Sequence, residues 1–127
     1  MRKAHRIALI GTGFIGAFYL NTLHQQRGLD RIELVCSRRA DQTREFAERY
    51  GVPRWTSDLD AAINDPDTDT VLVGVPNDAH HDVVLKAAAA GKNILCTKPL
   101  ARTAAEAKEM LDAVEKAGVW AGYLEDL

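Results

Sequence analysis

Three glycines at fixed spacing, Gly11, Gly13 and Gly16, are suited to binding a phosphate group. They follow an apolar run at residues 7–10 that predicts a strand, and they open a segment with helical periodicity. In that setting G-x-G-x-x-G is typical of a dinucleotide-binding turn. Gly11 would permit the tight turn, Gly13 the approach of a pyrophosphate to the backbone, and Gly16 close packing of helix on strand. The predicted cofactor-binding residues here are Gly11, Thr12, Gly13, Phe14, Ile15 and Gly16, and the alternative is a glycine-rich turn without a ligand.

The end of the second predicted strand, 32–36, bears on the choice of coenzyme. An NAD site usually places Asp or Glu there to hold the 2′-hydroxyl of the adenosine ribose. This chain has Ser37, Arg38 and Arg39 instead. A serine can donate to a 2′-phosphate and an arginine can pair with it, so these residues favour NADP over NAD. Alternatively both arginines are solvated and either coenzyme binds, and the nearby Asp41 leaves that alternative open.

Two further loops should reach the same edge, because ligands of parallel sheets bind beyond the carboxyl ends of the strands. His80 follows the predicted strand 70–75, and Lys98 follows the predicted strand 93–96. A lysine can donate to a substrate oxygen, stabilise a developing alkoxide or help to move a proton. Lys98 is therefore the first catalytic candidate and His80 the second. The alternatives are a solvated loop lysine and a partly exposed histidine in the first turn of a helix.

The elements that must position these residues alternate between short apolar runs and amphipathic segments. The central runs are continuously apolar rather than alternating, which is typical of strands covered on both faces. Thr103 with Glu106 predicts a capping box, and Asp41 predicts the N-cap of a helix over 42–50. We therefore predict an α/β fold with a doubly wound parallel (Rossmann) sheet of strand order 3-2-1-4-5-6. The predicted strands are Arg6–Ile10, 32–36, Arg54–Thr56, 70–75, 93–96 and 119–123.

Composition excludes several classes of protein. The chain has 127 residues and a net charge of −2, so it lacks the basic surface that nucleic acid binding requires. No apolar run approaches the length that a bilayer demands, and the basic N-terminus lacks a signal-peptide cleavage site. Cys36 and Cys96 have no metal-ligand spacing and end strands three places apart, so we expect free thiols and no metal. These observations favour a cytoplasmic protein.

Taken together, the motifs resemble the N-terminal domain of the Gfo/Idh/MocA oxidoreductases, which include glucose–fructose oxidoreductase and inositol dehydrogenase. The resemblance rests on Gly11–Gly16, on Pro76-Asn77-x-x-His80, and on Ala90-Gly91-Lys92 leading into Cys96-Thr97-Lys98-Pro99. It implies hydride transfer between NAD(P) and a sugar, polyol or related hydroxy or carbonyl compound. It also implies that Lys98 lies near the nicotinamide and the reacting oxygen, and that Pro76, Asn77 and His80 contact the cofactor. Thr97 stands where the family has Glu.

The family resemblance covers essentially all of residues 1–127, which we expect to form one dinucleotide-binding domain. Family members usually continue into a second domain that supplies most substrate contacts, and that C-terminal substrate domain is absent from this chain. We therefore expect dinucleotide binding without turnover, and self-association through the exposed rim or the last strand. A non-catalytic nucleotide-sensing module is the alternative. A methyltransferase is a weaker one, because it would normally carry an acidic residue near Ser37.

Overall fold

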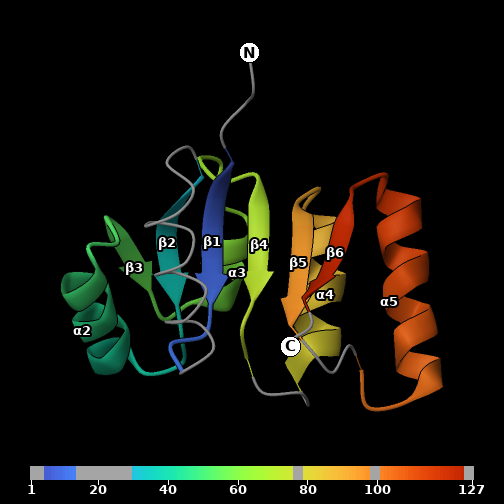
Figure 1. The fold of residues 1–127 in the computed structure, drawn as a ribbon, viewed down its shortest axis with the longest axis horizontal. Helices are drawn as coiled ribbons and strands as arrows, with labels where there is room; N and C mark the ends of the chain where they lie inside the picture. The colour runs from blue at the N-terminus through green and yellow to red at the C-terminus, as the bar shows by residue number, and fades with distance from the viewer. Residues whose placement is uncertain (1–4, 14–29, 76–78, 98–100, 125–127) are drawn as a thin grey trace.

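The computed structural model describes residues 5–13, 30–75, 79–97 and 101–124. Within them six strands form one sheet in the order β3-β2-β1-β4-β5-β6, and every neighbouring pair is parallel (Figure 1). The predicted strand order is confirmed. The strands are β1 (Arg6–Ile10), β2 (Arg31–Cys36), β3 (Arg54–Thr56), β4 (Thr70–Val73), β5 (Asn93–Thr97) and β6 (Ala121–Leu124). The helices are α2 (Ala40–Tyr50), α3 (Leu59–Ile63), α4 (His80–Ala89) and α5 (Ala104–Ala117).

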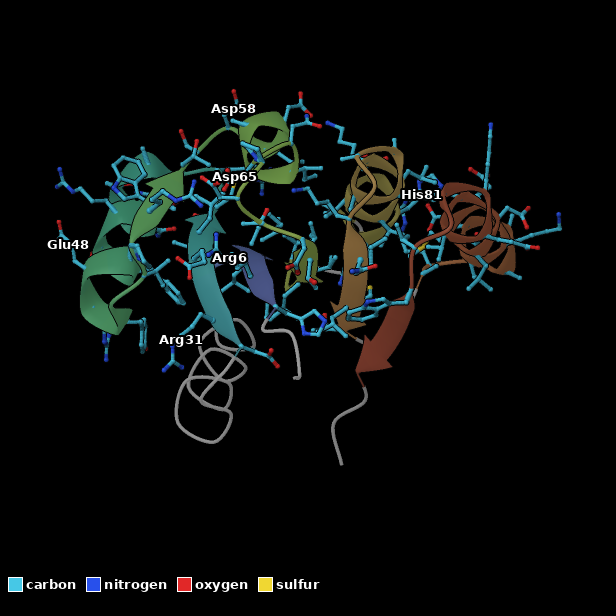
Figure 2. All side chains as sticks on the ribbon, turned by 90° about the horizontal axis from the view of Figure 1, so that it is seen from above. Arg6, Arg31, Glu48, Asp58, Asp65 and His81 are labelled. Atoms are coloured by element: carbon cyan, nitrogen blue, oxygen red, sulfur yellow. The ribbon has the colours of Figure 1, made fainter. Side chains whose placement is uncertain are left out.

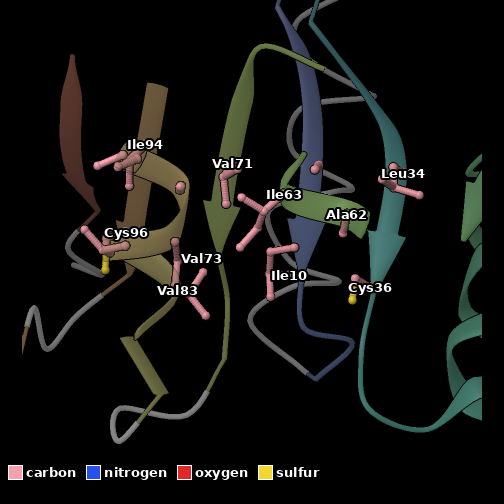
Figure 3. Packing of buried hydrophobic residues seen from close by; sticks show 14 of the residues in the cluster. Ile10, Leu34, Cys36, Ala62, Ile63, Val71, Val73, Val83, Ile94 and Cys96 are labelled. Carbon is pink, nitrogen blue, oxygen red and sulfur yellow. The ribbon is translucent and has the colours of Figure 1, made fainter. Parts of the chain in front are cut away.

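Both faces of the sheet are buried, as the continuous apolar runs predicted. On one face Ala8 and Ile10 of β1 belong to a cluster that includes side chains of α3, α4 and α5 (Figure 3). On the other face Ile7 and Leu9 pack with Phe46 of α2. Figure 2 looks along the strands and shows α3, α4 and α5 on the same side of the sheet. Successive residues of one strand thus enter opposite clusters, which requires a sheet that is covered on both sides.

Strand β4 ends at Val73, two residues earlier than predicted. Gly74 still donates its backbone N–H to the carbonyl oxygen of Ile10 at 2.8 Å. The carbonyl oxygen of Val75, however, accepts a hydrogen bond from the ring of His80 at 2.8 Å rather than from a strand neighbour. A side chain of α4 therefore draws the chain out of the sheet at the point where β4 reaches the predicted cofactor edge.

The helix starts agree with the sequence in one case and differ in another. Thr103 accepts the backbone N–H of Glu106 at 3.1 Å, as a capping box requires. The carboxylate of Glu106 accepts from the backbone N–H of Arg102 instead of that of Thr103. The predicted N-cap Asp41 is wrong: helix α2 begins at Ala40, and its N-cap position is Arg39. Asp41 lies in the first turn, where a carboxylate still favours the positive helix end.

A buried lysine stabilises the opposite edge of the sheet, where the strands begin. Lys92 is 7% exposed, and its ammonium group donates to the carbonyl oxygens of Asp65 and Thr68 and, at 3.2 Å, to Thr68 Oγ1. Burial lowers the pKa of Lys92. Asp65, labelled in Figure 2, pairs with Arg54 at 2.7 Å. Lys92 thus joins the loop before β4 to the start of β5 and belongs to the scaffold.

Among the described helices, none is long and apolar enough to cross a membrane.

Candidate dinucleotide-binding site

A cleft of about 480 Å³ opens where β1, β2 and β4 end. That volume falls within the range of about 300–1,000 Å³ typical of ligand sites. The structure brings two separate predicted segments together in its wall, the glycine turn after β1 and the polar residues after β2. The predicted residues that line it are Gly11, Thr12, Gly13, Ser37, Arg38 and Arg39. This edge is also where ligands of doubly wound sheets bind.

The two described glycines of the turn have different surroundings. Gly11 has φ +117°, and a Cβ built on it would lie 2.5 Å from the carbonyl oxygen of Gly74. The protein itself therefore requires glycine at position 11, both for the turn and for the close approach of β1 to β4. Among the described residues, a Cβ on Gly13 would meet nothing within 4 Å. The open side of Gly13 fits a ligand that approaches the backbone, as the pyrophosphate of a dinucleotide does.

The hydroxyl group of Ser37 is hydrogen-bonded inside the protein, to Thr43 Oγ1. Thr43 has no exposed surface, and its hydroxyl lies 2.7 Å from the carbonyl oxygen of Arg39. The donor role expected of Ser37 towards a 2′-phosphate requires a hydroxyl group that is not already engaged, and nothing in the sequence pattern singles out Thr43 as its partner. The contact crosses the turn between β2 and α2, so it depends on where α2 begins.

Positive charge lies at the mouth of the same cleft. Arg38 and Arg39 both line it and are exposed. The Arg39 guanidinium lies 3.4 Å from the carboxylate of Asp41. In the described part of the chain no ion pair of Arg38 within 4 Å is found.

Three residues that sequence reasoning missed complete this side of the cleft: Gln42, Ser57 and Leu59. Gln42 lies in the first turn of α2, and the other two follow β3. The predicted strand order contained the signal, because it places β3 beside β2. The residues after β3 must then reach the same edge as the residues after β2. Apolar and hydroxyl groups at this position could pack against the adenosine half of a dinucleotide.

His80 is buried, with 1% of its surface exposed, so the alternative of a partly exposed histidine is wrong. Its Nε2 donates to the carbonyl oxygen of Val75 at 2.8 Å and lies 3.5 Å from Thr97 Oγ1. Its Nδ1 faces the thiol of Cys96 at 3.4 Å. The ring therefore connects α4, the end of β4 and the end of β5. It does not line the cleft.

Strand β5 runs one residue further than predicted and ends at Thr97. Thr97 Oγ1 donates to the carbonyl oxygen of Val73 at 3.0 Å, which joins the ends of β4 and β5. Lys98, the first catalytic candidate, follows Thr97 directly in the chain. The remaining predicted site residues lie outside the described residues: Phe14, Ile15, Gly16, Pro76, Asn77 and Lys98.

Both cysteines are free and buried, as predicted. Burial raises the pKa of Cys36 and of Cys96 to about 11, so neither is a thiolate at neutral pH. Among the described residues no group of three or more His, Cys, Asp or Glu could hold a metal ion.

Comparison with known proteins agrees with this geometry. Levoglucosan dehydrogenase from Pseudarthrobacter phenanthrenivorans is 35% identical over 116 residues, which cover 86% of this chain and 30% of that enzyme. An NAD binding oxidoreductase from Klebsiella pneumoniae superposes with a TM-score of 0.88 at 27% identity, over 95% of this chain and 34% of the other. Biliverdin reductase from Synechocystis sp. PCC 6803, solved with biliverdin and NADP⁺, superposes with a TM-score of 0.84 at 27% identity, over 93% and 37%.

The chain spans about a third of the length of the curated relatives it matches. Residues 5–123 match the family described as "Oxidoreductase family, NAD-binding Rossmann fold". The match includes β1 to β5, most of β6 and the cleft at the carboxyl ends of the strands. The fold, the glycine turn and the relatives agree, and the chain belongs to the Gfo/Idh/MocA family of oxidoreductases, as their NAD-binding domain.

Proposed function

We propose that this chain binds NAD(P) in the cleft and serves hydride transfer to or from a sugar, polyol or related hydroxy or carbonyl compound. The observation that carries the proposal is the pair of glycines after β1. Gly11 is required by the protein's own packing, whereas no described residue occupies the space beside Gly13. A turn of this kind leaves backbone N–H groups for a pyrophosphate. The substrate class is supported by the relatives, of which levoglucosan dehydrogenase is one.

The residues divide between the two halves of the coenzyme. The adenosine half would lie over the ends of β2 and β3, between Ser37 and Leu59, because that is where a doubly wound sheet holds this ribose. The other half would then lie over the ends of β4 and β5. When bound, its nicotinamide ring supplies the hydride or accepts it.

Lys98 is our proposed catalytic residue. It follows Thr97 directly, and Thr97 is the last residue of β5 at the cofactor edge. A protonated lysine there would donate a hydrogen bond to the reacting substrate oxygen and stabilise its developing negative charge. In the opposite direction of reaction it would help to remove the hydroxyl proton.

For His80 we propose a positioning role in place of direct contact with the substrate. Its buried ring donates to the carbonyl oxygen of Val75 and faces Thr97. These two residues immediately precede Pro76 and Lys98 in the chain. The ring would hold both loops in register, so that Lys98 reaches the nicotinamide side. Catalysis depends on such geometry, because near-attack positioning contributes about 7–11 kcal/mol.

We infer NADP as the preferred coenzyme, with Arg38 as the main reader of the 2′-phosphate. Its exposed guanidinium lines the cleft, and a guanidinium pairs with phosphate oxygens in a bidentate manner. The relatives include one NAD-binding oxidoreductase and one structure with NADP⁺, so the family accommodates both. Arg38→Ala should weaken NADPH binding about tenfold and leave NADH binding nearly unchanged. Equal losses for the two coenzymes would contradict this assignment.

The test of the proposed function is a binding titration beside an activity assay. NADPH, NADH and S-adenosylmethionine are each added to the 127-residue chain during thermal unfolding. A ligand at 100 times its Kd stabilises the fold by about 2.7 kcal/mol, so the nicotinamide coenzymes should raise Tm and S-adenosylmethionine should not. We also expect no turnover of sugars or polyols, because we propose that substrate contacts come from the part of the relatives this chain does not span. Absence of dinucleotide binding would refute the proposal.

We further infer a cytoplasmic protein that self-associates. Both thiols are free, which fits a reducing compartment. Leu111 is 58% exposed and Trp120 is 44% exposed, and β6 is the outermost strand on that side of the described sheet. An exposed strand edge and apolar side chains favour pairing with a second copy. Sedimentation velocity should detect dimers that Leu111→Lys weakens, and a monomer at high concentration would refute the inference.

A further inference from the structure

The direction of one buried hydrogen bond decides what Ser37 offers to the coenzyme. Thr43 Oγ1 lies 2.7 Å from the carbonyl oxygen of Arg39 and 3.3 Å from that of Ser37. A carbonyl oxygen has no hydrogen, so the hydrogen between the closer pair of oxygens belongs to the hydroxyl of Thr43. A hydroxyl has only one hydrogen. Thr43 therefore has none left to give to the Ser37 hydroxyl, which contacts it.

The hydrogen between the two hydroxyl groups must then come from Ser37. Ser37 donates to Thr43 Oγ1, and what remains on its oxygen are acceptor lone pairs. Thr43 is completely buried, so water cannot replace its hydroxyl oxygen as the acceptor of the Ser37 hydrogen. Ser37 is half-buried and lines the cleft. Towards a ligand in the cleft, its side chain is thus an acceptor, although serine in general can donate as well.

We propose that Thr43 is a coenzyme-selectivity residue that acts through Ser37, an inference that rests on the proposed dinucleotide site. An acceptor at Ser37 suits the 2′-hydroxyl of NAD(H), which can donate to it. It disfavours the 2′-phosphate of NADP(H), whose oxygens are acceptors and carry about 1.5–2 negative charges. Arg38 acts in the opposite sense. Thr43 therefore restrains a preference for NADP that Arg38 would otherwise make stronger.

Thr43→Val tests this idea, with Thr43→Ser as its matched control. Valine keeps the shape of threonine but cannot accept a hydrogen bond, which frees the Ser37 hydroxyl to donate to a phosphate. The Arg39 carbonyl oxygen keeps the backbone N–H of residue 43 as a partner, at 2.9 Å, so the substitution leaves no orphaned carbonyl. Affinities for NADP⁺ and NAD⁺ are measured by calorimetry in each variant. Binding of 2′,5′-ADP and 5′-ADP isolates the adenosine half.

In Thr43→Val the ratio of the two Kd values should shift about tenfold towards NADP⁺, the effect of one charge-assisted hydrogen bond. The ratio should stay at its parental value in Thr43→Ser, which keeps the acceptor. In Thr43→Val/Ser37→Ala, which lacks the freed donor, the ratio should equal that of Ser37→Ala alone. A folded Thr43→Val protein with an unchanged ratio overturns the inference. So does a double variant in which Thr43→Val still adds its full shift to that of Ser37→Ala.

Two results keep the test independent of folding and of the proposed function. Ser37→Ala leaves Thr43 intact and should weaken NAD⁺ binding about fivefold more than NADP⁺ binding, because it removes the acceptor. The reverse order overturns the inference even if Thr43→Val does not fold. If the parent protein binds neither dinucleotide, the proposed function fails and this inference fails with it. If the parent binds both and the ratios do not respond, only this inference fails.

Discussion

Substituting alanine for each described glycine of the turn should separate folding from ligand binding. Gly11→Ala places a Cβ at φ +117°, which costs about 1–3 kcal/mol for a non-glycine residue. The same Cβ would lie 2.5 Å from the Gly74 carbonyl oxygen, which is backbone and cannot rotate away. The enforced shift costs about 1–3 kcal/mol more. Together we expect a loss of about 2–6 kcal/mol, out of the 5–15 kcal/mol typical of a domain.

Gly13→Ala is the matched control for stability and the test for binding. A Cβ there meets nothing within 4 Å, and Gly13 is not among the glycines with positive φ. Its free energy of unfolding should therefore stay within about 1 kcal/mol of the parent value. The added methyl group occupies the space that we assign to the pyrophosphate, so NADH and NADPH should bind at least about tenfold more weakly.

Urea unfolding measures the first effect and calorimetric titration the second. The expected pattern is a destabilised Gly11→Ala protein beside a stable Gly13→Ala protein that has lost affinity. A Gly11→Ala protein as stable as the parent would show that β1 and β4 do not approach so closely. A Gly13→Ala protein with parental affinity would show that the dinucleotide does not approach this backbone.

Three further outcomes are expected. His80→Phe keeps the ring volume but removes the N–H that donates to the partly buried carbonyl oxygen of Val75, which should cost about 1–3 kcal/mol in urea unfolding. His80→Gln restores an N–H near the position of Nε2 and should recover part of that loss; equal losses in both variants would exclude the hydrogen bond as the cause. Neither Cys36 nor Cys96 should react with a thiol reagent in the folded protein at pH 8, because burial raises the pKa of both to about 11; prompt labelling would contradict this. The hydrogen bond from Arg54 lowers the pKa of Asp65 below its ordinary value of 3.8. The resulting stabilisation is complete above that value and is lost as the pH falls through the lower pKa of the folded state. The stability difference between the parent protein and Asp65→Asn should therefore shrink below pH 4, which is about the ordinary carboxyl pKa. A difference independent of pH would refute that origin.

The sequence by itself determined the architecture and one wall of the site. Continuous apolar runs between amphipathic segments specify strands that are covered on both faces, and short connections specify parallel crossovers. The doubly wound strand order then followed, and the structure has it. Gly11 and Gly13 could be found because the turn is local: the strand, the turn and the expected helix lie within a few residues of one another.

Only the tertiary structure decided what the individual polar groups do. His80 has the sequence signature of an exposed first-turn residue, but its partner Cys96 is 16 positions away and buries it. The sequence pattern presents Ser37 as a donor. The position at which α2 begins brings the hydroxyl group of Thr43 into contact with that of Ser37. Gly11 needs to be glycine partly because Gly74, which directly follows strand β4, lies against it. Periodicity records which face of an element is buried. It does not record which atoms of distant elements meet there, and those contacts set the direction of each hydrogen bond in the site.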